Sequence, residues 1–137
     1  MRVVLDPNIL ISALLSPAGA PASLVTRWLA GDFELIVSRQ LMAELERALT
    51  YPKLRSRIQP EDAARFGELV QILAEELEDM PDPPRRSHDS DDDYLIALSA
   101  GAQAVLVSGD AHLLGLAPSI PVYSAQGCLE WLDSTIG

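Results

Sequence analysis

The sequence has little of what marks secreted and membrane proteins. Its single cysteine, Cys128, cannot form a disulfide within the chain, so nothing indicates an oxidising compartment. The longest apolar runs, such as residues 94–98, fall far short of the roughly 20 residues that a membrane span needs. A signal peptide is not indicated either, because Arg2 is followed by only three apolar residues before Asp6. We therefore expect a cytoplasmic protein that contacts no membrane.

Several common catalytic and ligand-binding patterns are also missing. The chain contains neither G-x-x-x-x-G-K-[ST] nor G-x-G-x-x-G, the usual glycine-rich loops that bind nucleotides. His88 and His112 have no metal-ligand spacing with Cys128, which argues against zinc, and Cys128 itself is expected to pack in a helix. Trp28 and Trp131 lie at helical spacing from leucines, which favours a core or interface role over base stacking.

The composition is that of a folded domain with an uneven charge distribution. The 137 residues suffice for one domain, and 48% hydrophobic and 22% charged residues are close to the globular average. The net charge is −10, and residues 75–93 carry nine acids against two arginines, whereas six of the ten basic residues lie between positions 39 and 65. So acidic a chain does not bind nucleic acid through charge alone, but an enzyme whose carboxylates hold metal ions still can. Most of the acidic run is consistent with solvated surface.

Short apolar runs alternate with helical patterns along the whole chain. Strands are predicted near residues 2–5, 33–37, 104–107 and 120–123, and helices near 7–14, 21–30, 39–49, 60–80, 90–100, 111–114 and 128–132. Asp6-Pro7 and Ser38 are typical helix starts. Strands separated by helices pair in parallel through right-handed crossovers, which predicts an α/β fold. No repeat or internal boundary is visible, so we expect residues 1–137 to form one domain.

Acidic residues gather where such a sheet binds ligands. Asp6 and Asp110 follow predicted strands, and the carboxyl ends of parallel strands are where ligands collect. Four more acids begin the helix that leads into the strand before Asp110, and this places them at the same edge: Asp89, Asp91, Asp92 and Asp93. Each acid alone has an ordinary interpretation as a helix cap or a partner of the helix dipole. Together they offer the hard oxygen ligands that suit Mg²⁺ or Mn²⁺, although position does not select which of the four neighbours points inward.

Four blocks of sequence, taken in order, resemble one known family. They are Val3 to Ala13, then Ser38 with Glu44-Leu45 and Tyr51 to Leu54, then Asp89 to Leu98, and finally Val105 to Asp110. The blocks resemble the motifs of PIN-domain ribonucleases, of the kind that form the VapC-type toxin of toxin–antitoxin pairs. The resemblance covers nearly the whole chain and implies a PIN-like three-layer α/β/α sandwich with a central, mostly parallel sheet.

The resemblance also implies a set of site residues. The implied catalytic metal ligands are Asp6, Glu44, Asp93 and Asp110, with support from Asn8, Ser108 and Asp92. Asp92 is the alternative to Asp93, and Asp89 and Asp91 resemble supporting or capping groups. For Glu44 the helical pattern is neutral, because Glu44 and Glu46 lie on opposite flanks of the apolar stripe and only the resemblance selects Glu44.

The implied activity is hydrolysis of RNA phosphodiester bonds with Mg²⁺ or Mn²⁺ as cofactor, leaving a 5′-phosphate and a 3′-hydroxyl. The implied partners are the RNA substrate and a cognate antitoxin protein, and helix faces bearing Trp28 or Trp131 could support a homodimer. Four basic residues could follow the RNA backbone, although a role in solubility explains them about as well: Arg47, Lys53, Arg55 and Arg57.

Two departures from the family pattern leave alternatives open. Pro7 replaces the usual threonine beside the first aspartate, and His112 replaces an aspartate that often follows the fourth acid. Both favour a second hypothesis, a PIN fold kept as a non-catalytic RNA-binding or scaffold module. A metal-dependent phosphatase is weaker, because it would want Asp-x-Asp where this chain has Asp6-x-Asn8. The principal acids are all present, so we expect an active enzyme.

Overall fold

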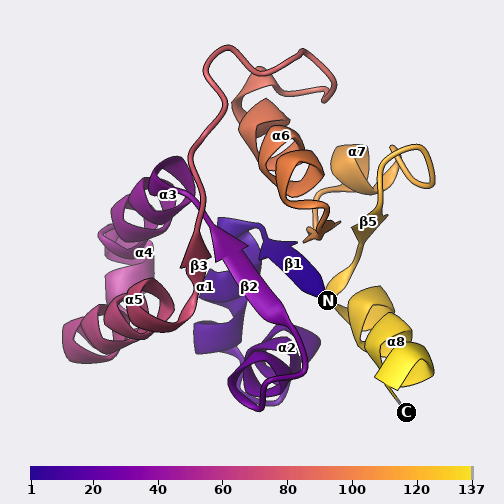
Figure 1. Ribbon diagram of the computed structural model, residues 1–137. Coiled ribbons are helices and arrows are strands. Elements are labelled where there is room, and N and C mark those ends of the chain that lie inside the picture. The colour runs from indigo at the N-terminus through magenta and orange to yellow at the C-terminus, as the bar shows by residue number, and fades with distance from the viewer. Residues whose placement is uncertain (137) are drawn as a thin grey trace.

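The computed structural model describes residues 1–136 and contains one parallel sheet (Figure 1). The strand order is β3-β2-β1-β4-β5. The strands are β1 (Arg2–Leu5), β2 (Glu34–Val37), β3 (Glu75–Glu76), β4 (Val105–Val107) and β5 (Val122–Tyr123). Each neighbouring pair runs parallel. The predicted α/β fold is therefore confirmed.

Helices occupy the connections between the strands. They are α1 (Pro7–Leu15), α2 (Ala20–Leu29), α3 (Arg39–Leu49), α4 (Pro52–Arg55), α5 (Pro60–Leu73), the 3-10 turn η1 (Ser90–Asp92), α6 (Asp93–Ala102), α7 (Ala111–Leu114) and α8 (Ala125–Ile136). From β1 the chain moves first to β2 and β3 and later to β4 and β5 on the other side. Right-handed crossovers in opposite directions put α1 to α5 on one face and α6 and α7 on the other (Figure 1). The helix α8 returns to pack on α2.

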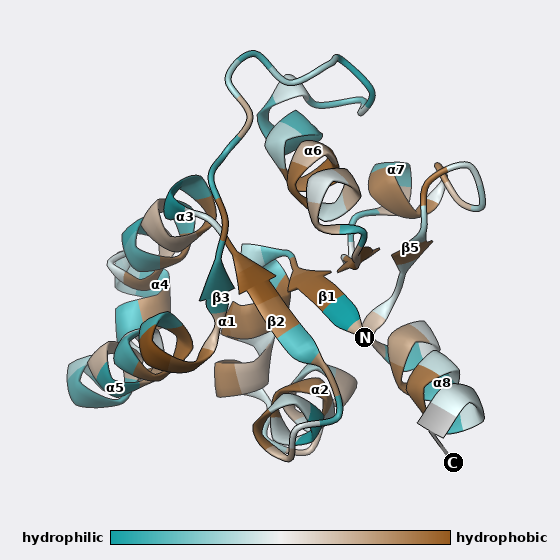
Figure 2. Cartoon of the chain, in the orientation of Figure 1, coloured by the Kyte–Doolittle hydropathy of each residue, from teal (hydrophilic) through white to brown (hydrophobic). Residues whose placement is uncertain are grey.

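The core lies on both sides of the central strands β1 and β2, which are mostly hydrophobic in the hydropathy colouring (Figure 2). Val3, Val4 and Leu5 of β1 are fully buried, and α6 presents Leu95 and Ile96 to the sheet at 1% exposure.

Within residues 1–136, no single helix is long and apolar enough to cross a bilayer. The helices α1 and α2 meet that criterion only as a pair, and the chain bends by 101° between them.

The predicted helix 60–80 is too long, because the chain leaves the helix after Leu73. Ala74 is extended, and β3 then pairs with β2 through Ile36 opposite Glu75. The helical pattern of leucines continues past this point, but Glu75 and Glu76 would place two negative charges at the negative end of the helix dipole. Pairing with the edge of β2 instead gives the backbone of these residues hydrogen-bond partners in the sheet. The short helix α4 was also missed, although Pro52 at its first turn is a typical start signal.

The topology defines where a ligand would bind. The central strand β1 neighbours both β2 and β4, and the chain reaches them in opposite directions. The carboxyl ends of β1 and β4 therefore form the switch point of the sheet, the usual ligand position in open α/β folds. Asp6 follows β1 directly, and Asp110 follows β4 after Ser108 and Gly109.

Candidate active site

Ser108 connects the two aspartates at the switch point. Its buried hydroxyl donates to Oδ2 of Asp6 at 2.9 Å and accepts the backbone N–H of Asp110 at 3.0 Å. Asp6 is only 7% exposed, and burial raises its pKa. Hydrogen bonds from the Asn8 N–H and from Ser108 partly offset that shift, and the charge of Asp110 adds to it. Both aspartates also cap the helices that follow them, so their capping roles and a shared site coexist.

Among the acids of this cluster, Asp92 has the most strongly raised pKa. Its pKa is raised to about 6, first by burial and then by the negative charges of four carboxylates: Asp6, Asp89, Asp110 and Glu44. Its side chain makes no capping hydrogen bond at the start of α6. A carboxylate held among like charges without a local donor is a site that favours a bound cation.

Glu44 reaches this cluster from α3. Its Oε2 accepts a hydrogen bond from the hydroxyl of Tyr94 at 2.7 Å, which fixes the carboxylate against the first turn of α6. Burial raises the pKa of Glu44, the Tyr94 hydrogen bond and the nearby Arg47 lower it, and the charges of Asp6 and Asp91 raise it. Glu46 lies on the other flank of α3, beside Ile58 and Ala63, so the structure separates the two glutamates that the helical pattern left equal.

Tyr94 is a site residue that sequence reasoning missed. It is 4% exposed, and burial together with the Glu44 carboxylate raises its pKa, so its hydroxyl stays a donor at neutral pH. Its position directly after the acidic run was the available signal.

Asp93 is placed differently from the expectation. Its Oδ1 accepts three hydrogen bonds: from the backbone N–H of Arg86 at 3.0 Å, from that of Ser87 at 2.8 Å, and from the Ser87 hydroxyl at 2.5 Å. Burial raises the pKa of Asp93, but these bonds and the charge of Arg85 outweigh it and bring the pKa below its usual value. Asp93 therefore anchors the loop before α6, and the structure favours Asp92 over Asp93 as the third acid of the cluster.

The remaining predicted residues lie around this cluster. Asn8 is exposed and contributes its backbone N–H to Asp6. Asp89 caps η1 by accepting the Asp91 N–H at 2.9 Å. Among the four basic residues, Arg47 acts on Glu44 through its charge, whereas Lys53, Arg55 and Arg57 are exposed on and after α4.

The cluster is open and not a closed cage. Among residues 1–136, no three carboxylate, imidazole or thiol groups lie close enough to share one metal ion. The available donors are nevertheless all oxygens, and Mg²⁺ commonly keeps several waters while binding one or two protein carboxylates. The donor set of Asp6, Glu44, Asp92 and Asp110 would therefore suit a hydrated divalent cation that one or two of these carboxylates bind directly and the others contact through its waters.

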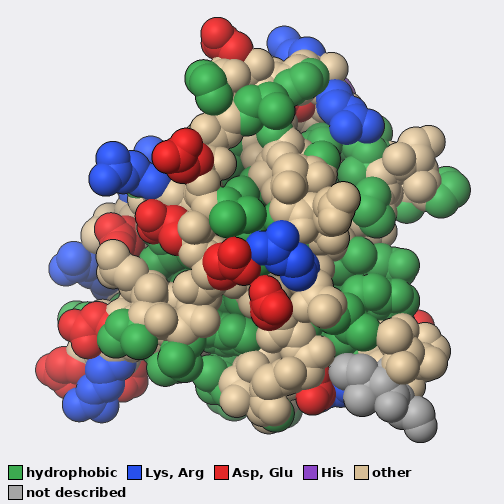
Figure 3. Space-filling model, in the orientation of Figure 1, with side chains coloured by type: hydrophobic (Ala, Val, Ile, Leu, Met, Phe, Trp, Pro, Cys, Tyr) green, Lys and Arg blue, Asp and Glu red, His purple; other side chains and the backbone are tan. Residues whose placement is uncertain are grey.

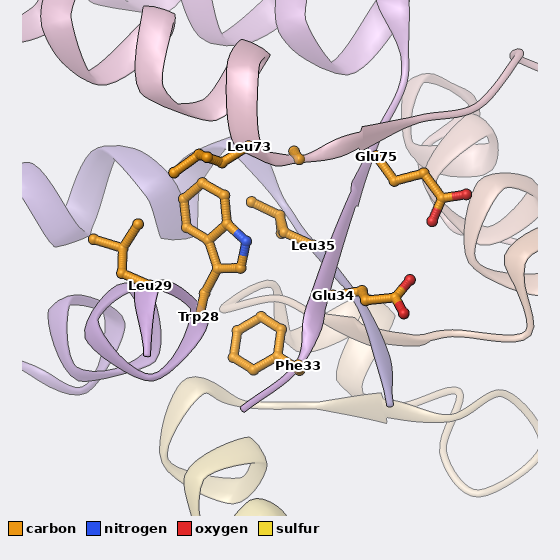
Figure 4. Close-up of a pocket in the computed structure, with 8 residues that line it drawn as sticks. Trp28, Leu29, Phe33, Glu34, Leu35, Leu73 and Glu75 are labelled. Carbon is orange, nitrogen blue, oxygen red and sulfur yellow. The ribbon is translucent and has the colours of Figure 1, made fainter. Parts of the chain in front are cut away.

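A different hollow lies at the amino edge of the sheet, between α2 and the end of α5 (Figure 4). Its volume is about 440 Å³, and its apolar wall includes Trp28, Phe33 and Leu73. In the space-filling view, hydrophobic side chains lie beside a mixed group of acidic and basic ones on this face (Figure 3). Arg2 donates to Glu75 there at 2.8 Å, which lowers the pKa of that carboxyl. The two carboxylates that line this hollow, Glu34 and Glu75, both pair with Arg2.

The tryptophans are packing residues, as predicted. Trp28 is 6% exposed, and Trp131 stacks on Tyr123 with ring centroids 5.7 Å apart.

Comparison with known proteins agrees with this architecture. The family model described as PIN domain matches residues 2–112. No curated protein sequence matches the chain. The crystal structure of PAE2754 from Pyrobaculum aerophilum superposes with a TM-score of 0.69 at 18% identity, covering 98% of this chain and 90% of that one.

Two further solved structures are similar at low identity. VapBC2 from Rickettsia felis, bound to a DNA fragment from its promoter, gives a TM-score of 0.64 at 14% identity, covering 90% of this chain and 98% of that one. VapBC-1 from nontypeable Haemophilus influenzae gives 0.62 at 18% identity, covering 92% of this chain and 99% of that one. At such identities these likenesses establish the fold.

Proposed function

The chain belongs to the PIN domain family, and from that premise we propose that it is a metal-dependent endoribonuclease, the toxin of a toxin–antitoxin pair. The observation that carries the proposal is the position of Asp92 among other carboxylates, where burial and then their negative charges raise its pKa to about 6. A group of carboxylates at the switch point of the sheet, without a protein nucleophile among them, suits hydrolysis by an activated water.

The four acids would hold the hydrated cation, one or two of them directly and the others through its waters. When bound, the divalent ion supplies a water of lowered pKa and a positive charge opposite the phosphate. Ser108 holds the Asp6 carboxylate in place, and Tyr94 does the same for Glu44. Asp110 is oriented by the N–H groups of His112 and Leu113 at 2.8 and 3.2 Å.

Neither departure from the family pattern removes this arrangement. Pro7 occupies the first position of α1, where its missing N–H costs no hydrogen bond, and Asp6 keeps its bonds to Asn8 and Ser108. His112 gives its backbone N–H to Asp110. Both residues are therefore compatible with an active site.

The proposed partner is an antitoxin protein, and the support is structural likeness to two VapBC structures. RNA is proposed as substrate because the acidic motifs of this chain resemble those of PIN-domain ribonucleases, and the family model matches residues 2–112. A homodimer and a cytoplasmic location remain parts of the same proposal. The genomic neighbour tests the partner directly: a short reading frame for a DNA-binding protein beside this gene is the expected finding.

Incubation of the purified protein with single-stranded RNA tests the activity. We expect cleavage with Mg²⁺ or Mn²⁺ that stops in EDTA and leaves a 5′-phosphate on the downstream fragment. Single-stranded DNA of the same sequence serves as the comparison substrate. RNA binding without cleavage under every metal condition would favour the alternative, a non-catalytic RNA-binding or scaffold module.

A further inference from the structure

The two histidines of the chain stack on each other at the edge of the acidic cluster. His88 lies in the loop before η1, and His112 lies in the first turn of α7. Their ring centroids are 4.2 Å apart and the ring planes differ by 15°. Both residues are exposed. The pair therefore presents stacked aromatic rings to solvent.

The stacked pair joins the two segments that carry the site. The backbone N–H of His112 donates to Asp110 at 2.8 Å. His88 precedes Asp89, whose charge acts on Asp92. A molecule whose phosphate lay at Asp92 and Asp110 would have its neighbouring groups within reach of these rings.

Other roles for the pair have less support. Within residues 1–136, neither histidine belongs to a group of three ligands that could hold a metal ion. Two exposed rings gain little from stacking on each other, so holding the loop against α7 is a weak reason for both rings to be there. The tryptophans are not available for ligand stacking at this edge, because Trp28 is buried and Trp131 stacks on Tyr123.

We propose that the His88–His112 pair is a stacking platform for a nucleobase of single-stranded RNA next to the phosphate at the carboxylate cluster. The inference rests on the proposed ribonuclease function and adds a substrate contact to it. Proteins bind unpaired RNA bases by stacking them on aromatic side chains, histidine included, and such stacking tolerates any base. A chain with a net charge of −10 repels RNA, so attraction that does not depend on charge is especially useful here.

The test measures RNA binding without cleavage. In the otherwise unmodified protein, the affinity for a fluorescein-labelled single-stranded RNA is followed by anisotropy with Ca²⁺ in place of Mg²⁺, under conditions in which gel electrophoresis shows that the RNA stays intact. His88→Ala and His112→Ala should each weaken binding about tenfold, the scale expected for one lost base stack. His88→Phe and His112→Phe keep a flat ring and should stay within about threefold of the parent.

A series of RNAs with one base removed at each position locates the contact. Removing the base at one particular position should weaken RNA binding by the parent protein but should not weaken binding by His112→Ala. Tyr51→Ala is the matched control, because it removes another exposed aromatic ring, at the start of α4. This variant should keep the position-dependent effect.

Three results would overturn the platform. Unchanged affinity in both alanine variants is the first. Equal losses in the phenylalanine and alanine variants would show that ring nitrogens or charge, and not stacking, are responsible. A loss that depends on no base position and accompanies a lower melting temperature would show that the pair only holds the loop to α7. If unmodified protein cleaves RNA while these results appear, only the platform fails; if it neither binds nor cleaves RNA, the proposed function fails with it.

Discussion

Acidic side chains have opposite surroundings at the amino edge of the sheet, where the parallel strands begin, and at the carboxyl edge, where they end. At the amino edge, Glu75 is paired with Arg2 and its pKa is lowered. At the carboxyl edge, Asp92 lies among like charges and its pKa is raised to about 6. Acidic residues are common at both edges, so their number does not identify a site. What distinguishes the carboxyl edge is negative charge that the described residues do not compensate.

Two consecutive residues, Asp92 and Asp93, show the same contrast between a raised and a lowered carboxyl pKa. Asp92 and Asp93 are neighbours at the start of α6, yet Asp93 accepts three hydrogen bonds from the loop 86–87 and its pKa is lowered. Asp93 finds its hydrogen-bond donors within the fold, whereas Asp92 makes no capping hydrogen bond and lies among other acids. The predictions below test this difference.

The largest expected effect is on RNA cleavage at the carboxyl edge. Asp92→Asn and Asp110→Asn should each lower the cleavage rate by about 100-fold or more, because the lost charge would otherwise help to hold the cation opposite the phosphate. The fold should survive, since asparagine caps helices nearly as well as aspartate. Glu75→Gln at the amino edge is the control and should cleave RNA at the normal rate. Equal rates in all three variants, measured in one metal-dependent assay, would remove the catalytic assignment.

The second effect is on stability and belongs to Asp93. Asp93→Asn should lower the free energy of unfolding by about 1–2 kcal/mol, because hydrogen bonds to a charged acceptor become neutral ones. Asp92→Asn should instead leave the metal-free protein as stable or more stable, since it removes repulsion. Urea denaturation in EDTA gives both values. A larger loss for Asp92→Asn than for Asp93→Asn would contradict the placement of the two side chains.

The third effect is the pH dependence of that stability. The raised pKa of Asp92 means that the folded state binds more protons than the unfolded state between about pH 4 and 6. Stability from this group is therefore lost as the pH rises through that window. Asp93 has the opposite sign: its lowered pKa stabilises the fold above the ordinary aspartate pKa, and this stability is lost as the pH falls below it.

Urea midpoints between pH 3 and 7.5, without metal, measure these slopes. Asp92→Asn should flatten the fall between pH 4 and 6, and Asp93→Asn should reduce the loss at acid pH. An unaltered slope in Asp92→Asn would mean that its carboxylate is not perturbed by its neighbours.

The smallest expected effect concerns the two glutamates of α3. Glu44→Gln should weaken metal-dependent cleavage while sparing the metal-free fold, because glutamine still accepts the Tyr94 hydrogen bond. Glu46→Gln should change the free energy of unfolding by less than about 0.5 kcal/mol and leave cleavage unchanged. The reverse pattern of activity would show that α3 presents its other flank to the site.

Sequence reasoning anticipated the sheet because its signals are local. The apolar runs of β1 and β4 and the caps at Asp6 and Ser38 appear directly in the sequence and in the structure. It missed β3, since nothing local marks two glutamates as a strand and only pairing with β2 makes them one.

At the site, the pattern of the sequence located the acids but not their directions. Consecutive aspartates at a helix start point about 100° apart around the helix axis. The choice between them depends on a loop contact with Ser87 that no spacing rule contains. The choice of Glu44 likewise depends on Tyr94, which lies 50 residues further along the chain.

The most direct test of the carboxyl-edge site is a Mn²⁺ titration of the melting temperature in four proteins: the unmodified chain, Asp92→Asn, Asp93→Asn and Glu75→Gln. A cation that binds only the folded state stabilises it by about 2.7 kcal/mol at 100 times its dissociation constant. We predict a rise of several degrees in the unmodified chain, in Glu75→Gln and, from a lower starting temperature, in Asp93→Asn, with little or none in Asp92→Asn. No rise in the unmodified chain, or an equal rise in Asp92→Asn, would contradict the site.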